Sequence, residues 1–467
     1  MAQIDSVILA DSGEQEDRKL KFSEKLAVVI NGCFGTFHLQ VVQLFILFFY
    51  TDIMKINSAY VAGLFLITRI VDAFLTPAFG ILIDRTTTPW GKYKPWLIAG
   101  GLLTGIFGWF TYTNFNLGPT GNLIYATVTY FLYSLVFNLG SAPNTAMIPA
   151  VTKRIDDRAS IGQIAFFLSI IGALAAQIGV QPLYKVLGQG NDAAGFSWIM
   201  GMIAVISLVI AFYQQRTIKE RYIVQAPAKG KGPALKEMLV AVFTNKTAVI
   251  VYLYVFAMHL ANGIRSGASI YYFKYYFHND NLLTITGLVA ILPTMLGVGL
   301  STVVSKKLKI KKLLIISSIV NIVSMFMVMF IPSSATGVNL YIVFLVLLSF
   351  FTGLATPAQG TMLPAAMDYT EWKTKMNINA FMGSLQGFLT TFATALSGSI
   401  TAGVLAVVGY VGGAAEQSST SLFGLKLLVG VVPAVIFLLT LGVAFFDLTE
   451  EKQKQITKEL AERRKTL

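Results

Sequence analysis

Charged residues are scarce in this chain. Asp, Glu, Lys and Arg together make up 13% of its 467 residues, whereas a typical soluble domain has about 25%. Hydrophobic residues make up 55% and occur in runs of about 20 or more, which is long enough for a helix to cross a bilayer. The composition therefore excludes an ordinary soluble protein and predicts an all-α integral membrane protein.

Cysteine is nearly absent, and the usual catalytic motifs are missing. The single cysteine, Cys33, lies in the first apolar run, so neither a disulfide framework nor a zinc site is expected. The sequence has no P-loop, no ATP-hydrolysing motif and no nucleophile elbow. We therefore expect no enzyme activity, no resident cofactor and no metal site.

The apolar runs divide into twelve predicted membrane-spanning helices. They cover residues 25–50, 58–83, 96–114, 121–149, 160–187, 196–214, 247–277, 284–305, 313–331, 338–366, 377–410 and 421–447. Several exceed the ~20 residues that cross the hydrocarbon core, which predicts tilted helices or helices that extend beyond it.

Lys and Arg alternate between the two sides of this topology. Loops after the even-numbered spans are basic, as in 306–312 with its five lysines, whereas loops after the odd-numbered spans are short and nearly neutral. The positive-inside rule places the basic loops and both termini in the cytoplasm. The net charge of +13 is thereby explained without a nucleic-acid partner. We expect a multi-pass protein of the cell membrane (the cytoplasmic membrane if the source is bacterial).

A Pro/Gly/Lys stretch, QAPAKGKGPALKE, separates six spans from six. It predicts an N-terminal six-helix bundle at 1–214, a cytoplasmic linker at 215–246, a second six-helix bundle at 247–448 and a cytoplasmic tail at 449–467. An internal repeat supports this division, because Pro149 near the end of span four matches Pro364 near the end of span ten. The ends of spans one and seven, FFYTD and FKYYFHND, match in the same way.

Span two carries two charges at bilayer depth, Arg69 and Asp72. A charge there costs ~2.5–3.5 kcal/mol on insertion scales, and it marks a functional site by default. The spacing of three residues also allows the pair to neutralise each other as a structural feature. The two interpretations are compatible, because a paired carboxylate can still bind a cation.

Uncharged polar residues form a possible solute-binding seam along several spans. On span one, Thr36, Gln40 and Gln43 follow helical spacing. Most lone hydroxyls in membrane helices bond to backbone of their own or a neighbouring helix. His38 is either a proton carrier, given its ordinary pKa of about 6.5, or a satisfied hydrogen-bond donor. Arg265 lies mid-span and needs a partner or water that the sequence does not identify.

Four segments carry a family resemblance: RIVDAFLTP, DRTTTPWGKYKPW, IYYFKYY and DYTEWKT. Together they resemble the glycoside–pentoside–hexuronide:cation symporters of the major facilitator superfamily, over essentially all twelve spans. The resemblance implies the major facilitator fold and the transport of sugars, glycosides or uronides with Na⁺, Li⁺ or H⁺. Parallel halves with a solute site between them, near the midplane, are typical of that fold.

The family's binding residues are largely replaced in this chain. Asp72 matches its first span-two carboxylate, but Thr76 stands at the second and Ser141 at the span-four carboxylate. By the same resemblance the substrate positions fall at Thr36, Thr145, Thr356 and Thr391. One carboxylate with hydroxyls does not neutralise Na⁺ as two carboxylates would. The resemblance therefore leaves the coupling ion open between H⁺ and Na⁺.

These observations predict a secondary active transporter (a symporter) of a sugar, glycoside or related small solute, coupled to H⁺ or Na⁺ through Asp72. The alternatives are an uncoupled facilitator, a carrier of an amphipathic lipid-like solute, and a non-transporting solute sensor. A lipid-like solute needs a lateral opening. A sensor needs a sizeable cytoplasmic output domain, and the ends and the central linker are too short for one. The expected partners are the solute and membrane lipid.

Charged residues at the predicted cytoplasmic ends are candidates for a gate. They are Asp84, Arg85, Lys92, Asp368 and Glu371. Fixed charges there can pair with the neighbouring bundle in one transport state and separate in another, or they only anchor the topology.

The topology is directly testable with reporter fusions. A reporter fused after Lys231 should be cytoplasmic, and one fused near Ser419 should be external, because the positive-inside rule orients the spans between them. Reversed accessibility of the two reporters to a membrane-impermeant reagent would overturn the span assignment.

Overall fold

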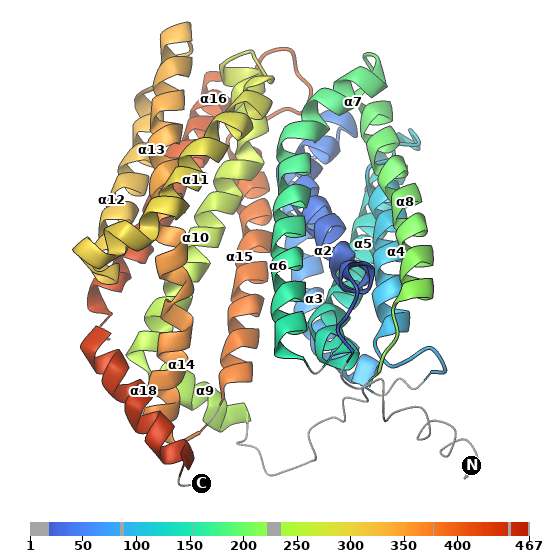
Figure 1. Cartoon of the computed structure of the whole chain (residues 1–467). Coiled ribbons are helices and arrows are strands. Elements are labelled where there is room, and N and C mark those ends of the chain that lie inside the picture. Colours follow the sequence, from blue (N-terminus) through green and yellow to red (C-terminus); the bar gives the residue numbers. More distant parts are fainter. Residues whose placement is uncertain are drawn as a thin grey trace. The chain divides into compact units, whose positions relative to one another are not determined.

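The computed structural model describes residues 18–84, 88–152, 154–221, 235–376, 378–446 and 450–465 (Figure 1). Within these ranges the regular secondary structure is helical, apart from one isolated β-bridge between Thr88 and Gly91. A helix pairs its backbone N–H and C=O groups internally, which a lipid environment requires. The predicted all-α fold is confirmed.

The first half of the chain forms the helices of predicted spans one to six. They are α2 (Phe22–Val41) with the π-helical turns η1 (Val42–Ile46) and η2 (Phe49–Ile53), α3 (Ser58–Asp84), α4 (Lys94–Thr111), α5 (Gly118–Val151), α6 (Ile155–Leu174) with η3 (Ala175–Gly179) and α7 (Val180–Gly188), and α8 (Asp192–Thr217).

The second half forms the helices of spans seven to twelve and two flanking helices. They are α9 (Leu235–Phe243), α10 (Lys246–Tyr271) with η4 (Tyr272–Tyr276), α11 (Leu282–Leu308), α12 (Ile310–Met327) with η5 (Val328–Phe330), α13 (Ala335–Gly360), α14 (Met362–Thr374), α15 (Asn379–Val407), α16 (Ser419–Lys426) with η6 (Leu427–Val431), α17 (Val432–Phe437), η7 (Leu438–Phe445) and α18 (Glu450–Lys465).

Ten of the described helical segments are long and apolar enough to cross a membrane. The other two predicted spans, 58–83 and 96–114, coincide with α3 and α4. Every predicted span therefore falls on a helix, which is consistent with twelve crossings. The cytoplasmic position of the termini stays a prediction.

Contacts within the chain define two compact units. The first contains 1–42, 52–56 and 70–228, and the second contains 43–51, 57–69 and 229–467. The predicted linker at 215–246 lies partly outside the described residues, although α8 ends inside it at Thr217 and α9 occupies 235–243. The predicted domain boundaries stay a prediction.

The repeat noted in the sequence has a counterpart in the backbone. Spans one and seven each end in a π-helical turn, η2 and η4. Each turn is followed two residues later by a residue in the left-handed region, Lys55 with φ 58° and His278 with φ 52°. Left-handed backbone is uncommon for residues other than glycine, so its recurrence at matching places supports the alignment of the two halves.

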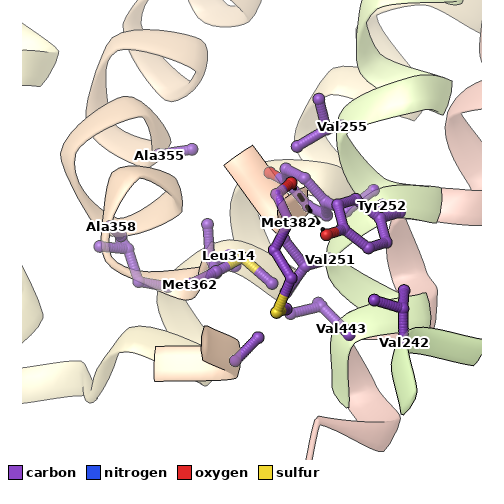
Figure 2. Close-up of a cluster of buried hydrophobic side chains, with 14 of the residues drawn as sticks. Val242, Val251, Tyr252, Val255, Leu314, Ala355, Ala358, Met362, Met382 and Val443 are labelled. Carbon is purple, nitrogen blue, oxygen red and sulfur yellow. Dashed lines mark hydrogen bonds between the residues drawn. The ribbon is translucent and has the colours of Figure 1, made fainter. Parts of the chain in front are cut away.

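A cluster of buried side chains holds the second unit together (Figure 2). Val242 of α9, Tyr252 of α10, Leu314 of α12, Met362 of α14 and Met382 of α15 all belong to it. The Tyr252 hydroxyl donates a hydrogen bond to the Met382 carbonyl oxygen at 3.0 Å, so this buried hydroxyl is satisfied. The cluster packs α9, α10, α12, α13, α14, α15 and η7 against one another.

The start of α4 is held by a carboxylate from a distant part of the chain. The Glu220 carboxylate accepts hydrogen bonds from the backbone N–H groups of Lys92, Tyr93 and Lys94 at 2.8, 2.7 and 2.6 Å. The Lys94 amine donates to the Gln215 carbonyl oxygen at 2.8 Å. An anion is favoured at a helix N-terminus, where N–H groups have no partner within the helix. Glu220 therefore supplies the cap that the residue before α4 does not.

A buried ion pair fixes the start of α2 in the same unit. The Lys25 amine lies 2.7 Å from the Asp157 carboxylate, and both side chains are buried. The other Asp157 oxygen accepts from the Leu20 N–H at 3.1 Å. Because α6 begins at Ile155, this carboxylate joins the first turns of α2 and α6.

Glu220→Ala should destabilise the protein, because three N–H groups at the start of α4 lose their acceptor. We expect the free energy of unfolding to fall by about 1–3 kcal/mol, with a smaller loss for Glu220→Gln. Thermal unfolding of the purified protein measures this loss. Asp156→Ala is the matched control, since Asp156 is an exposed acid in the first turn of α6. Equal effects of Glu220→Ala and Asp156→Ala would contradict the capping role.

Candidate functional site

Asp72 lies in the middle of α3, and its side chain is 7% exposed. The Ser134 hydroxyl of α5 donates a hydrogen bond to Asp72 Oδ2 at 2.6 Å. This distance lies within the range of O–H···O hydrogen bonds. The structure thus places a hydroxyl group from span four beside the predicted span-two carboxylate.

Ser134 is not among the residues that the sequence selects on span four. It belongs to the same face of α5 as Asn138, Ser141 and Thr145, which follow at intervals of four, three and four residues. Extending that stripe back by one turn would have found it. Ser141 lies two turns farther along α5, about 10 Å away, and its hydroxyl donates to the Asn138 carbonyl oxygen at 3.0 Å.

Thr76, a predicted ion-site residue, and Thr145, a predicted substrate residue, are placed only by their backbone. Thr76 follows Asp72 by one turn on α3, and Thr145 follows Ser141 by one turn on α5. Their side chains are outside the part of the structure that is described, so their predicted roles stay predictions.

The first unit contains a cavity of about 230 Å³ among α2, α4, α5, α6 and α8, lined by both polar and apolar side chains. Its described lining has hydroxyl, amide and imidazole groups but no Asp, Glu, Lys or Arg. The polar groups include Asn31, Thr36, His38, Thr104, Ser141 and Asn144. An uncharged hydrogen-bonding surface of this kind suits a neutral polar molecule. Two of the predicted site residues, Thr36 and Ser141, are brought together here.

His38 lies at this cavity and is only partly satisfied. Its ring is 1% exposed and stacks on Tyr133 with centroids 6.3 Å apart. Nδ1 is 2.7 Å from the Phe34 carbonyl oxygen, so Nδ1 carries the proton and donates. Nε2 is then an acceptor, and it has no partner among the described residues. The local bond fits the satisfied-donor interpretation, and Nε2 is buried next to Gly108 of α4, where an added Cβ would lie 3.0 Å from it.

The remaining predicted substrate residues lie elsewhere. Gln40 is half-buried on α2, and Gln43 of η1 faces Gly263 of α10, where an added Cβ would lie 3.6 Å from its Nε2. In the second unit, the Thr356 hydroxyl donates to the Thr352 carbonyl oxygen at 2.8 Å, as expected for a lone hydroxyl. Thr391 is exposed on α15.

The predicted gating residues are found at helix ends. Lys92 precedes α4, with its N–H on Glu220 and its amine 5.2 Å from the Tyr93 ring centroid. Asp84 ends α3, and Arg85 lies outside the described residues. Asp368 and Glu371 are half-buried on α14. Pairing of these charges between bundles stays a prediction.

The DYTEWKT segment contacts the tail helix. Trp372 Nε1 of α14 donates to Glu459 of α18 at 2.6 Å, and the Lys452 amine lies 5.6 Å from the Tyr369 ring centroid. Ile456 and Leu460 of α18 pack on the same face of α14. The apolar side of the amphipathic tail is therefore buried against the end of span ten.

Comparison with known proteins identifies the family. The sequence model of the family described as MFS/sugar transport protein matches residues 36–450. The chain belongs to this family. As a member of the MFS/sugar transport family it is a multi-pass membrane transporter with the major facilitator fold, and the resemblance to glycoside–pentoside–hexuronide:cation symporters is confirmed.

Two similar transporters align with nearly the whole of this chain. The isoprimeverose transporter of Lactiplantibacillus pentosus is 28% identical over 439 residues, which cover 93% of this chain and 90% of that protein. The inner membrane symporter YicJ of Escherichia coli is 28% identical over 426 residues, covering 90% of this chain and 91% of that one.

Solved structures share the fold at low identity. The D-xylose–proton symporter aligns with a TM-score of 0.62 at 14% identity, covering 89% of this chain and 97% of that one. A bacterial homologue of the human lysosomal transporter Spinster aligns with a TM-score of 0.66 at 13% identity, covering 90% and 95%. These similarities establish the architecture alone.

The structure pairs Asp72 with Ser134, whereas the family resemblance points to Ser141. Substitution of each serine distinguishes the two assignments. Ser134→Ala removes a hydrogen bond to a charged group, so we expect at least a tenfold change in the ion concentration that gives half-maximal transport. Ser141→Ala is the matched control on the same face of α5 and should change it less than about twofold. Na⁺ and pH titrations of transport by the two variants measure the difference. Indistinguishable titrations would exclude Ser134 from the ion site.

Proposed function

We propose that this member of the MFS/sugar transport family is a symporter that couples H⁺ or Na⁺ to the uptake of a neutral sugar, glycoside or related polyhydroxy solute. The observation that carries the proposal is Asp72, the only acidic residue within the first six predicted spans. Its burial beside Ser134 supports a role as the ion-binding carboxylate. The names of the relatives, a sugar transporter and a symporter, support the same activity.

Coupling follows from the charge of Asp72 in the proposed cycle. An ionised carboxylate is costly in a closed, water-excluding state of the carrier. Binding of H⁺ or Na⁺ neutralises it and lowers the cost of that state. The Ser134 hydroxyl can donate to the ionised carboxylate, and it can turn its oxygen toward Na⁺ or a protonated carboxyl. The ion therefore favours the reorienting state.

The solute is proposed to be neutral because the cavity offers no charge to pair with an ionised group. The Thr36 and Ser141 hydroxyls and the Asn31 and Asn144 amides of its lining present both donors and acceptors. Sugar hydroxyls also donate and accept, so each can exchange its water partners for protein partners. A lipid-like solute would leave these groups unpaired, which disfavours it.

Transport in proteoliposomes tests the proposal. A panel of glycosides should include at least one that is accumulated when an inward Na⁺ or proton gradient is imposed, and the effective gradient identifies the ion. Asp72→Asn keeps the shape of the side chain but cannot be protonated and carries no charge. We expect this variant to bind and exchange the solute but not to accumulate it.

Asp156→Asn, at an exposed position, is the control and should accumulate solute like the parent. If Asp72→Asn also does so, Asp72 is a structural residue. The protein would then be an uncoupled facilitator or would be coupled elsewhere, with His38 and His259 as the next candidates.

A further inference from the structure

Arg265 is a cation within a membrane-spanning helix, and the proposed symport does not use it. It lies in α10, eleven residues before the end of η4 at Tyr276, which is about 16 Å along the helix. Its side chain is partly buried, and its Nε is fully buried without a hydrogen-bond partner. A charge at this depth normally has a counter-charge or faces water.

In the described part of the second unit, the polar group beside the Arg265 guanidinium is neutral. It is the Tyr341 hydroxyl of α13, which lines the same small pocket. Between α10 and η7, the only acidic residues within described helices are Asp368 and Glu371. Asp368 follows Tyr341 by 27 residues, about 40 Å along a straight helix. The amines of Lys274 and Lys426, which lie over the Phe48 and Tyr276 rings, are cations as well and cannot compensate its charge.

The guanidinium borders a small void between three helices. The void measures about 10 Å³ and is lined by Arg265 of α10, Ser324 of α12 and Tyr341 of α13, with apolar side chains such as Phe344 and Leu348 completing the wall. Ser324 and Tyr341 are 2% and 5% exposed. A space of this size is on the order of one water-sized sphere, too small for a sugar or an organic acid.

The polar groups around the void are all able to donate. The guanidinium has five N–H donors and no acceptor, and each hydroxyl has one O–H. The Tyr341 oxygen lies beside the guanidinium, so its own proton can turn toward the void. A positive charge with converging donors in an apolar wall is complementary to a small anion and leaves a water with fewer acceptors than it needs.

We propose that Arg265, Tyr341 and Ser324 form a binding site for a monatomic anion of chloride size. The bound anion neutralises the charge of α10 inside the bundle and holds α10, α12 and α13 together. The site belongs to the second unit and is separate from the cavity and from Asp72 in the first.

Anion-dependent stability tests the site without a transport assay. The purified protein is heated in detergent with sodium chloride or with sodium gluconate at equal ionic strength, since gluconate is too large for the void. Chloride should raise the melting temperature saturably by about 2–4 °C. Arg265→Gln should abolish the difference between the two salts. Tyr341→Phe should raise the chloride concentration for half the effect about tenfold, because one bond to a charged group is lost.

Arg216→Gln is the matched control, since Arg216 is an exposed arginine at the end of α8, and it should respond to chloride like the parent. The wild-type comparison stands even if a variant fails to fold. Equal melting temperatures of the parent in chloride and gluconate would overturn the proposal. A chloride response that persists in Arg265→Gln would also overturn it. So would a stabilisation by glucuronate that requires Arg265 and is larger than the stabilisation by chloride.

Discussion

The cost of placing charge and unpaired backbone groups in hydrocarbon governs this structure. Backbone polar groups are satisfied within helices, and most ionised side chains are kept at helix ends, where they hold neighbouring segments. The Lys25–Asp157 pair at 2.7 Å and the three N–H bonds to Glu220 are two such anchors. Each uses a charge that the membrane excludes from the interior to fix where a helix begins. The positions of the helix ends and of these charged side chains are therefore set together in this fold.

The few charged groups inside the membrane helices stand out against that rule. Asp72 and Arg265 lie within α3 and α10, where hydrophobic side chains alone would span the bilayer at lower cost. The Ser134 hydroxyl is one partner of Asp72, and the Tyr341 hydroxyl lies beside Arg265. Charged groups within the membrane are candidate sites for small ions of opposite sign. These are a cation at Asp72 in the proposed symport and an anion at Arg265 in the site inferred above.

Hydropathy predicted the spans well because the length of an apolar run is a local property that the bilayer thickness selects. The repeat of spans one and seven was also visible, and matching π-helical turns accompany it. Contacts between distant residues were not predictable, since they depend on which helix faces meet. Glu220 lies 126 to 128 residues from the N–H groups it caps. The family resemblance placed the span-four residue of the ion site at Ser141, whereas the hydrogen bond to Asp72 comes from Ser134.

The arrangement of α5 constrains how a neutral solute and an ion can be coupled in the proposed cycle. The cavity lining contributes no charge, so the solute cannot neutralise Asp72 or repel its ion directly. The two ligands must then stabilise the same conformation of the protein. Ser134 on Asp72 and Ser141 at the cavity share one face of α5, two turns apart. Because a helix moves as a rigid element over that distance, a tilt of α5 alters the ion site and the cavity together. The proposed coupling therefore needs no contact between solute and ion. It needs only that both ligands bind to the same helix, α5.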